Sequence, residues 1–284
     1  MKRFETNHGL SLAYSDEGEG PGAPLLCLAG LTRSKRDFDH FAAALPQHAG
    51  PRRIIRLDSR GRGASDHDPD FSRYNVMVEA GDAIALLDHL GVEKVVVVGT
   101  SRGGILATVI AATSPERLAG VILNDVGPVI EPDGIQRIVG YLGMRPHAST
   151  MAEAAANLAA LFGPLFNGVD AIFWHEWAER SYVEAEDGLD LAYDPKLRDA
   201  TLAQSAANTD DAGLWRLFES LGPIPTLLLR GANSDILSAA TVAEMRVSKP
   251  DLQTAEIPDR GHTPRLDEPA ALDAIAAFLR SVDG

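Results

Sequence analysis

Residues 95–107 constrain the fold of this chain more than any other stretch. Four consecutive valines at 95–98 have the composition of a buried strand, and a helical segment begins at residue 102. Between them, Gly99-Thr100-Ser101-Arg102-Gly103 fits the pattern Gly-x-Ser-x-Gly. In this context the serine lies on a sharp strand-to-helix turn that lifts its hydroxyl above the sheet. The glycines are expected because side chains at 99 and 103 would collide across the turn.

Two alternative interpretations of this turn are a helix N-cap and a dinucleotide-binding loop. Serine is common at N-caps, where its side chain accepts a hydrogen bond from the helix backbone. A dinucleotide-binding loop has the spacing Gly-x-Gly-x-x-Gly, which the glycines at 99, 103 and 104 do not fit. The serine is therefore interpreted as a nucleophile.

Apolar runs of strand length alternate with helical segments along the chain. The predicted strands lie near 3–7 and 11–16 and at 24–29, 53–57, 94–99, 119–124, 225–230 and 252–257. The predicted helices lie at 37–46, 76–90, 102–114, 239–248 and 268–282. Continuous apolar strands that alternate with helices predict an α/β fold with a mostly parallel sheet covered on both faces.

This alternation breaks between about residues 128 and 220, where no convincing strand is found. The stretch is rich in Ala, Leu and aromatic residues and is predicted to be a helical cap. Residues 1–127 and 221–284 are then the core domain. We expect the cap to gate a largely apolar pocket that favours uncharged acyl groups. Four cap aromatics are candidate substrate-binding residues: Tyr141, Trp174, Trp177 and Trp215.

Charge and composition exclude several classes of partner. The formal net charge is −14, which argues against nucleic acid because phosphate binding requires clustered Lys and Arg. The same charge would repel an anionic membrane surface. The single cysteine, Cys27, excludes an intrachain disulfide. Neither a signal peptide nor a run of 18 or more apolar residues is found, so we predict a cytoplasmic protein without a membrane span.

A serine hydroxyl is a weak nucleophile until a base takes its proton. His262 is the candidate base because it lies between Gly261 and Pro264, on a loop directly after the last predicted strand. A histidine at the carboxyl end of a parallel sheet can reach a serine at the same end.

Three further segments carry a resemblance to a known family. Residues 25–31 are similar to a strand and oxyanion loop, residues 57–65 to an Asp-x-Arg-Gly-x-Gly-x-Ser loop, and residues 261–269 to a histidine loop and final helix. With the turn at Ser101, they make the chain resemble the α/β-hydrolase superfamily over nearly its whole length. The resemblance implies a mostly parallel eight-stranded sheet with helices on both faces and a helical cap.

Two aspartates are candidates for the acid that orients the histidine. Asp235 lies in the polar loop after the strand at 225–230, which is the commoner position in this superfamily. Asp125 ends the strand before the cap, where some members place their acid. We predict that Asp235 is the acid and that Asp125 bonds backbone N–H groups in a stiff exit turn.

The resemblance also implies an oxyanion hole formed by the backbone N–H groups of Leu31 and Arg102. Ala29 stands where the family usually has a histidine that helps to hold this loop. Arg33 and Arg102 lie near the hole and could bind a substrate carboxylate or pair with acids of the protein. Pairing is favoured, and Arg33 is retained as a candidate substrate-binding residue.

By this resemblance the chain is a carboxylesterase or lactonase that forms an acyl-enzyme on Ser101. His262 is then the general base and Asp235 the orienting acid. A hydrolase of C–C bonds in diketone-like acids would use the same triad and is the main alternative; a perhydrolase and a non-catalytic ligand receptor are the others. The only expected partner is a small-molecule ester or lactone. No cofactor or metal is expected, since His175-Glu176 lacks the second histidine of a zinc motif at position 179.

Overall fold

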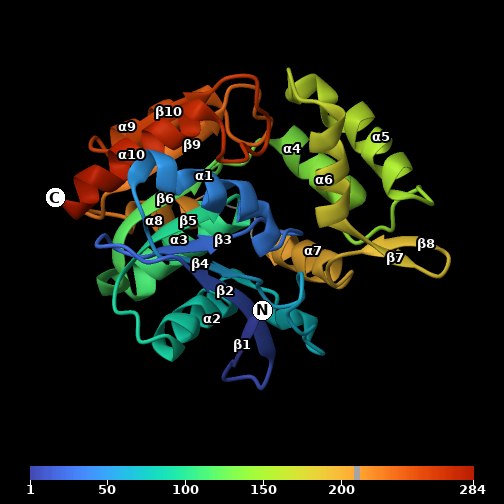
Figure 1. The fold of residues 1–284 in the computed structure, drawn as a ribbon, viewed down its shortest axis with the longest axis horizontal. Helices are drawn as coiled ribbons and strands as arrows, with labels where there is room; N and C mark the ends of the chain where they lie inside the picture. Colours follow the sequence, from blue (N-terminus) through green and yellow to red (C-terminus); the bar gives the residue numbers. More distant parts are fainter. Residues whose placement is uncertain (208–211) are drawn as a thin grey trace.

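The computed structural model describes residues 1–207 and 212–284, which form one large sheet with helices on both faces (Figure 1). Its strand order is β1-β2-β4-β3-β5-β6-β9-β10. The strands are β1 (Lys2–Glu5), β2 (Ser11–Glu17), β3 (Leu25–Leu28), β4 (Ile54–Leu57), β5 (Val95–Thr100), β6 (Leu118–Asn124), β9 (Thr226–Gly231) and β10 (Gln253–Ile257). The β1–β2 and β2–β4 pairs are antiparallel, while the strands from β4 to β10 in this order run parallel. The predicted α/β fold with a mostly parallel eight-stranded sheet is confirmed.

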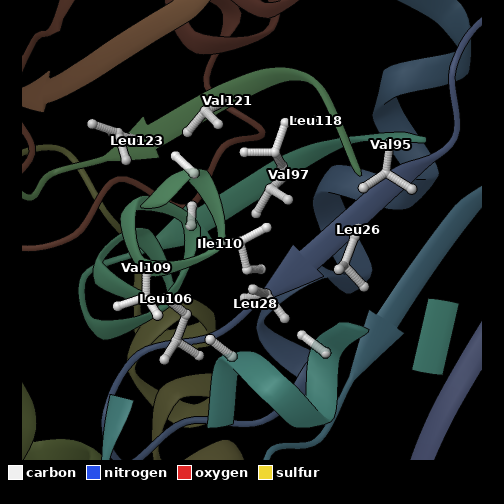
Figure 2. Packing of buried hydrophobic residues seen from close by; sticks show 14 of the residues in the cluster. Leu26, Leu28, Val95, Val97, Leu106, Val109, Ile110, Leu118, Val121 and Leu123 are labelled. Atoms are coloured by element: carbon white, nitrogen blue, oxygen red, sulfur yellow. The ribbon is translucent and has the colours of Figure 1, made fainter. Parts of the chain in front are cut away.

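The sheet is buried because successive side chains of its central strands enter two different apolar clusters. Val95 and Val97 of β5 point to one face and Val96 and Val98 to the other, and all four are fully buried. Figure 2 shows Val97 beside Ile110 of the helix that follows β5, and Val95, Leu106 and Val109 belong to the same cluster. This two-sided burial explains why the strand is continuously apolar in sequence.

Helices cover both faces. One face carries α1 (Asp39–Ala49) and α10 (Pro269–Asp283). The other carries α2 (Val76–His89), α3 (Arg102–Thr113), α8 (Ala212–Glu219) and α9 (Ala239–Ser248). Short 3-10 helices lie at Lys35–Phe38, Phe71–Arg73, Pro115–Arg117 and Gly163–Leu165. No described helix is both long and apolar enough to cross a membrane.

The segment between β6 and β9 is mainly helical, with one difference from the prediction. It contains α4 (Pro132–Tyr141), α5 (Met151–Phe162), α6 (Ala171–Ser181) and α7 (Leu197–Ala207) before α8. It also contains an antiparallel hairpin, β7 (Tyr182–Ala185) and β8 (Gly188–Leu191), where no strand was expected. Each strand has only four residues, so the alternation of buried and exposed residues is too short to stand out in the sequence.

The helices α4, α5 and α6, called the cap helices below, lie together beyond one end of the sheet (Figure 1). They enclose an apolar cluster of their own that includes Leu158, Phe162, Phe166 and Trp174. In contrast, α8 packs against α3, and its Phe218 belongs to the main core. The helices of this segment that lie beyond the end of the sheet are therefore α4 to α6 (Figure 1).

Candidate active site

Ser101 occupies the turn between β5 and α3 in a conformation that L-residues rarely adopt. Its backbone has φ 51° and ψ −118°, and its side chain makes no hydrogen bond to the N-terminus of α3. The hydroxyl instead lies 2.9 Å from His262 Nε2. The N-cap interpretation is therefore wrong, because the hydroxyl points to the histidine and not to the helix backbone.

The two glycines of the pattern allow this turn to form. A Cβ at position 99 would lie 2.4 Å from the carbonyl oxygen of Gly103, across the turn as predicted. A Cβ at position 103 would lie 1.9 Å from the carbonyl oxygen of Leu28. The second clash is with the last residue of β3. Because the predicted oxyanion loop follows β3 directly, Gly103 also allows that loop to approach Ser101.

Gly103→Ala should therefore destabilise the fold strongly. The neighbouring atoms are backbone atoms of a central strand and cannot move aside, so we expect a loss of about 3 kcal/mol or more in the free energy of unfolding. Urea unfolding followed by circular dichroism measures this. Gly81→Ala in α2 is the matched control: a Cβ there meets nothing within 4 Å, and the change should be neutral or stabilise by about 0.5–1 kcal/mol. Equal stability of the two variants would contradict this account of the turn.

His262 and Asp125 complete a chain of hydrogen bonds that starts at Ser101. His262 Nδ1 lies 2.8 Å from Asp125 Oδ2, while Nε2 faces the serine. Because an ionised carboxylate only accepts hydrogen bonds, the proton of the neutral imidazole is on Nδ1 and Nε2 is free to accept from Ser101. The three side chains thus have the geometry of a nucleophile, a base and an orienting acid.

Asp125 is held in place by the sheet itself. Thr100 of β5 pairs with Asn124 of β6, so the residues that follow them, Ser101 and Asp125, lie at the same level of neighbouring strands. The Asp125 side chain is fully buried. The Gly231 N–H donates to its Oδ1 at 2.8 Å, and the Ser234 hydroxyl donates to its Oδ2 at 2.6 Å. These bonds fix the carboxylate and, through it, the imidazole ring.

Asp235 lies elsewhere, and the prediction that it orients His262 is wrong. Its Oδ2 forms an ion pair at 2.6 Å with Nη1 of Arg137, a residue of α4. The loop after β9 leaves the sheet before it reaches position 235, and Ser234 is the residue of that loop which touches Asp125. Asp125 does accept a backbone N–H bond, as predicted, but its other oxygen faces the histidine.

The predicted oxyanion donors lie beside Ser101. Leu31 lines the same pocket as Ser101, and Arg102 is the first residue of α3. A Cβ on the intervening Gly30 would lie 3.7 Å from the Ser101 Cβ, which shows how closely this loop approaches the serine. Across the described parts of the chain, neither the Leu31 N–H nor the Arg102 N–H donates a hydrogen bond to another group. Both N–H groups are therefore free for a ligand oxygen.

A buried arginine that was not predicted as a site residue anchors the loop that was predicted to form the oxyanion hole. Arg62 Nε donates to the carbonyl oxygen of Leu31 at 2.8 Å. Its Nη1 lies 3.2 Å from Glu79, which also binds Arg102 Nη2 at 2.8 Å. Burial opposes ionisation of Glu79, but the charges of Arg102 and Arg62 outweigh it and hold its pKa below the ordinary value. This network therefore holds the loop at Leu31, in which Ala29 replaces the histidine that is usual in the family.

Only some of the predicted substrate-binding residues line the pocket beside Ser101. Arg33, Tyr141 and Trp177 line it. Burial raises the pKa of Tyr141 to about 12, so its hydroxyl remains a protonated donor near neutral pH. Trp174 is instead buried inside the cap and stacks on Trp177 with ring centroids 5.6 Å apart. Trp215 packs on the main core beside Phe218. The predictions for Trp174 and Trp215 are therefore wrong.

The two arginines near the oxyanion hole pair with acids, as was favoured. Arg33 donates to both carboxylate oxygens of Asp37, at 2.7 and 2.9 Å. Arg102 binds Glu79 and does not line the pocket. Across residues 1–207 and 212–284 there is also no group of three or more His, Cys, Asp or Glu side chains placed to hold a metal ion.

Comparisons with known proteins show the family of this chain. A family model described as the alpha/beta hydrolase family matches residues 25–275. The chain is 38% identical to a 3-hydroxybutyrate-oligomer hydrolase of Cupriavidus necator, covering 94% of this chain and 92% of that protein. It is 28% identical to an sn-1-specific diacylglycerol lipase of Mus musculus, covering 95% and 85%. The crystal structure of an alpha/beta hydrolase from Novosphingobium aromaticivorans superposes with a TM-score of 0.89 at 38% identity, covering 98% and 97%.

Proposed function

Because this chain belongs to the alpha/beta hydrolase family, we propose that it is a serine hydrolase that cleaves a carboxylic ester or lactone through an acyl-enzyme on Ser101. The hydrogen-bond chain from Ser101 through His262 to Asp125 carries this proposal. It connects the pocket-lining hydroxyl of a residue with a strained backbone to an imidazole, and a buried carboxylate fixes the tautomer of that imidazole. That arrangement is what activates a serine for attack on a carbonyl carbon.

In the proposed reaction, His262 Nε2 takes the proton of Ser101 as Oγ bonds to the ester carbonyl carbon. The negative charge that develops on the carbonyl oxygen is stabilised by the N–H groups of Leu31 and Arg102. The protonated His262 donates its proton to the departing alcohol oxygen as the C–O bond breaks. A water molecule, deprotonated by His262, then attacks the acyl carbon, and the acid leaves as Ser101 recovers its proton. Asp125 keeps the imidazole oriented and stabilises its charged form.

The relative from Cupriavidus necator suggests where to look for substrates. Its name states that it acts on oligomers of 3-hydroxybutyrate, which are short oligoesters. Short esters of hydroxy acids are therefore the first class that we propose for this chain. Hydrolysis of C–C bonds in diketone-like acids remains the alternative, since it would use the same three side chains.

A substrate panel separates these functions. Purified protein is assayed with p-nitrophenyl esters of increasing acyl length, with lactones, with 3-hydroxybutyrate dimers and with a diketone acid. We expect turnover of the esters or lactones. Turnover of the diketone acid alone would favour the C–C hydrolase, whereas ligand binding without any turnover would favour the receptor.

A further inference from the structure

The pocket beside Ser101 contains an excess of positive charge, although the protein as a whole is strongly acidic. Of the described residues that line it, Arg33, Arg180 and Arg265 are cationic, and Asp37 is the one acid. Two of these arginines have firm partners. Arg33 is bound in bidentate fashion by Asp37 and donates to the Ser181 hydroxyl at 2.5 Å. Arg265 pairs with Asp267, a residue outside the pocket lining, at 2.7 Å.

Arg180 differs from the other two because its guanidinium has only a long ion pair and no hydrogen bond within the described chain. Its side chain is only 9% exposed, yet no hydrogen bond to its guanidinium occurs anywhere in the described chain. The nearest acid, Glu176, lies 3.6 Å from Nη2. Glu176 already binds His40 at 2.8 Å and Arg265 at 3.0 Å. A buried cation without hydrogen-bond partners is costly, and such groups are normally paired.

The surroundings of Arg180 indicate what kind of partner it lacks. Burial lowers the pKa of its guanidinium, and the positive charges of Arg33 and Arg265 add to this, against the opposing effect of Asp37 and Glu176. A guanidinium has five N–H donors in a planar fork, which match the two oxygens of a carboxylate. An anionic group in the pocket would therefore satisfy donors that the protein leaves free.

We infer that Arg180 binds a carboxylate of the substrate, so that this enzyme prefers esters that carry a free carboxylate in the same molecule. The inference rests on the proposed ester hydrolysis and specifies its substrate class. Arg180 lies near the end of α6 beside Ser181, whose hydroxyl accepts from Arg33, three residues after Gly30. The anion site is thus connected to the oxyanion loop, within the pocket that Ser101 also lines. This replaces the expectation that the pocket favours uncharged acyl groups.

Paired substrates and an Arg180→Met variant test this inference. Monomethyl glutarate carries its carboxylate on the acyl side, and dimethyl glutarate is its neutral counterpart. Acetoxybutyric acid carries its carboxylate on the alcohol side of the acetyl ester, and its methyl ester is the neutral counterpart. In at least one pair, we expect the wild type to hydrolyse the charged member with the higher kcat/KM. Arg180→Met should lower the charged-to-neutral ratio of kcat/KM by about 10- to 100-fold, mainly through KM, because a charge-assisted hydrogen bond is lost.

The matched control is Arg145→Met. Arg145 pairs with Asp187 on the cap surface at 2.6 Å and does not line the pocket, so the ratio should stay as in the wild type. Thermal unfolding separates recognition from a structural role. Arg180→Met should change Tm little, because it removes one ion pair at 3.6 Å and no hydrogen bond within the described protein. An unchanged ratio in Arg180→Met, or a lowered Tm as its only effect, would overturn the inference.

Binding to a Ser101→Ala protein distinguishes failure of this inference from failure of the proposed function. Isothermal titration calorimetry with monomethyl glutarate and with dimethyl glutarate needs no turnover. Tighter binding of the monoester that is lost in Ser101→Ala/Arg180→Met supports the anion site even if no ester is hydrolysed. Ester hydrolysis by the wild type without any such difference in binding or in kcat/KM supports the proposed function and refutes the anion site.

Discussion

Ser101→Ala should lower kcat for ester hydrolysis by about 10⁴-fold or more while leaving the protein folded. The hydroxyl is the group placed to form the acyl-enzyme, and its removal leaves His262 without the proton that it would take. Across the described chain, the hydroxyl makes a hydrogen bond only with His262, so the fold of the turn does not depend on it. Steady-state kinetics with a p-nitrophenyl ester and circular dichroism measure the two effects.

Ser114→Ala provides the control for this experiment. Ser114 lies at the other end of α3 and does not line the pocket, so the variant should retain wild-type kcat. Retention of more than about one hundredth of wild-type kcat by a folded Ser101→Ala protein would contradict a nucleophilic role, since removal of a triad nucleophile costs far more.

Asp125→Asn should lower kcat by up to about 10⁴-fold, because an amide at this position can hold the imidazole in the wrong tautomer. The side-chain oxygen of the introduced amide would still accept the Gly231 N–H, so the backbone turn should persist. Kinetics over a range of pH and a near-UV circular dichroism spectrum distinguish loss of catalysis from loss of fold.

Asp235→Asn is the matched variant and should leave kcat within a few-fold of wild type. It removes only a partly exposed ion pair with Arg137, which contributes about 1 kcal/mol or less to stability. If Asp235→Asn abolished turnover while Asp125→Asn retained it, the acid would have to be reassigned to Asp235.

The sequence was sufficient to predict the sheet, the turn at Ser101 and the loop of His262. These features depend on local composition: continuous apolar strands, glycines where a Cβ would collide with backbone, and a Gly-His loop after the last strand. Each of them can be recognised within about ten residues of sequence. The sheet order then brings the serine and the histidine together.

The acid could not be assigned correctly because its position depends on strand register. Asp125 directly follows Asn124, which pairs with Thr100 next to Ser101. Asp235 lies beyond the end of β9, on a loop that turns toward the cap. The signal that was available is that Asp125 directly follows a predicted strand and Ser101 follows one after a single residue, whereas Asp235 is separated from its strand by a longer loop.

Residues of the pocket were harder to predict because side chains of one helix face different neighbours. Trp174 and Trp177 both belong to α6, yet only Trp177 lines the pocket. Arg62 lies in a recognised loop, but its contact with Leu31 is a long-range hydrogen bond that no local pattern reveals. Arg180 could not be singled out from the other arginines, because its lack of hydrogen-bond partners exists only in the folded protein.

The most direct test of the central claim is to locate the acyl group during turnover. The enzyme is mixed with a p-nitrophenyl ester, quenched in acid within milliseconds, digested and analysed by peptide mass spectrometry. We expect the acyl group on Ser101, with much slower acylation in a His262→Ala variant. Turnover with the acyl group on another residue, or without any covalent intermediate in either protein, would contradict the claim that this chain is a serine hydrolase acting through Ser101.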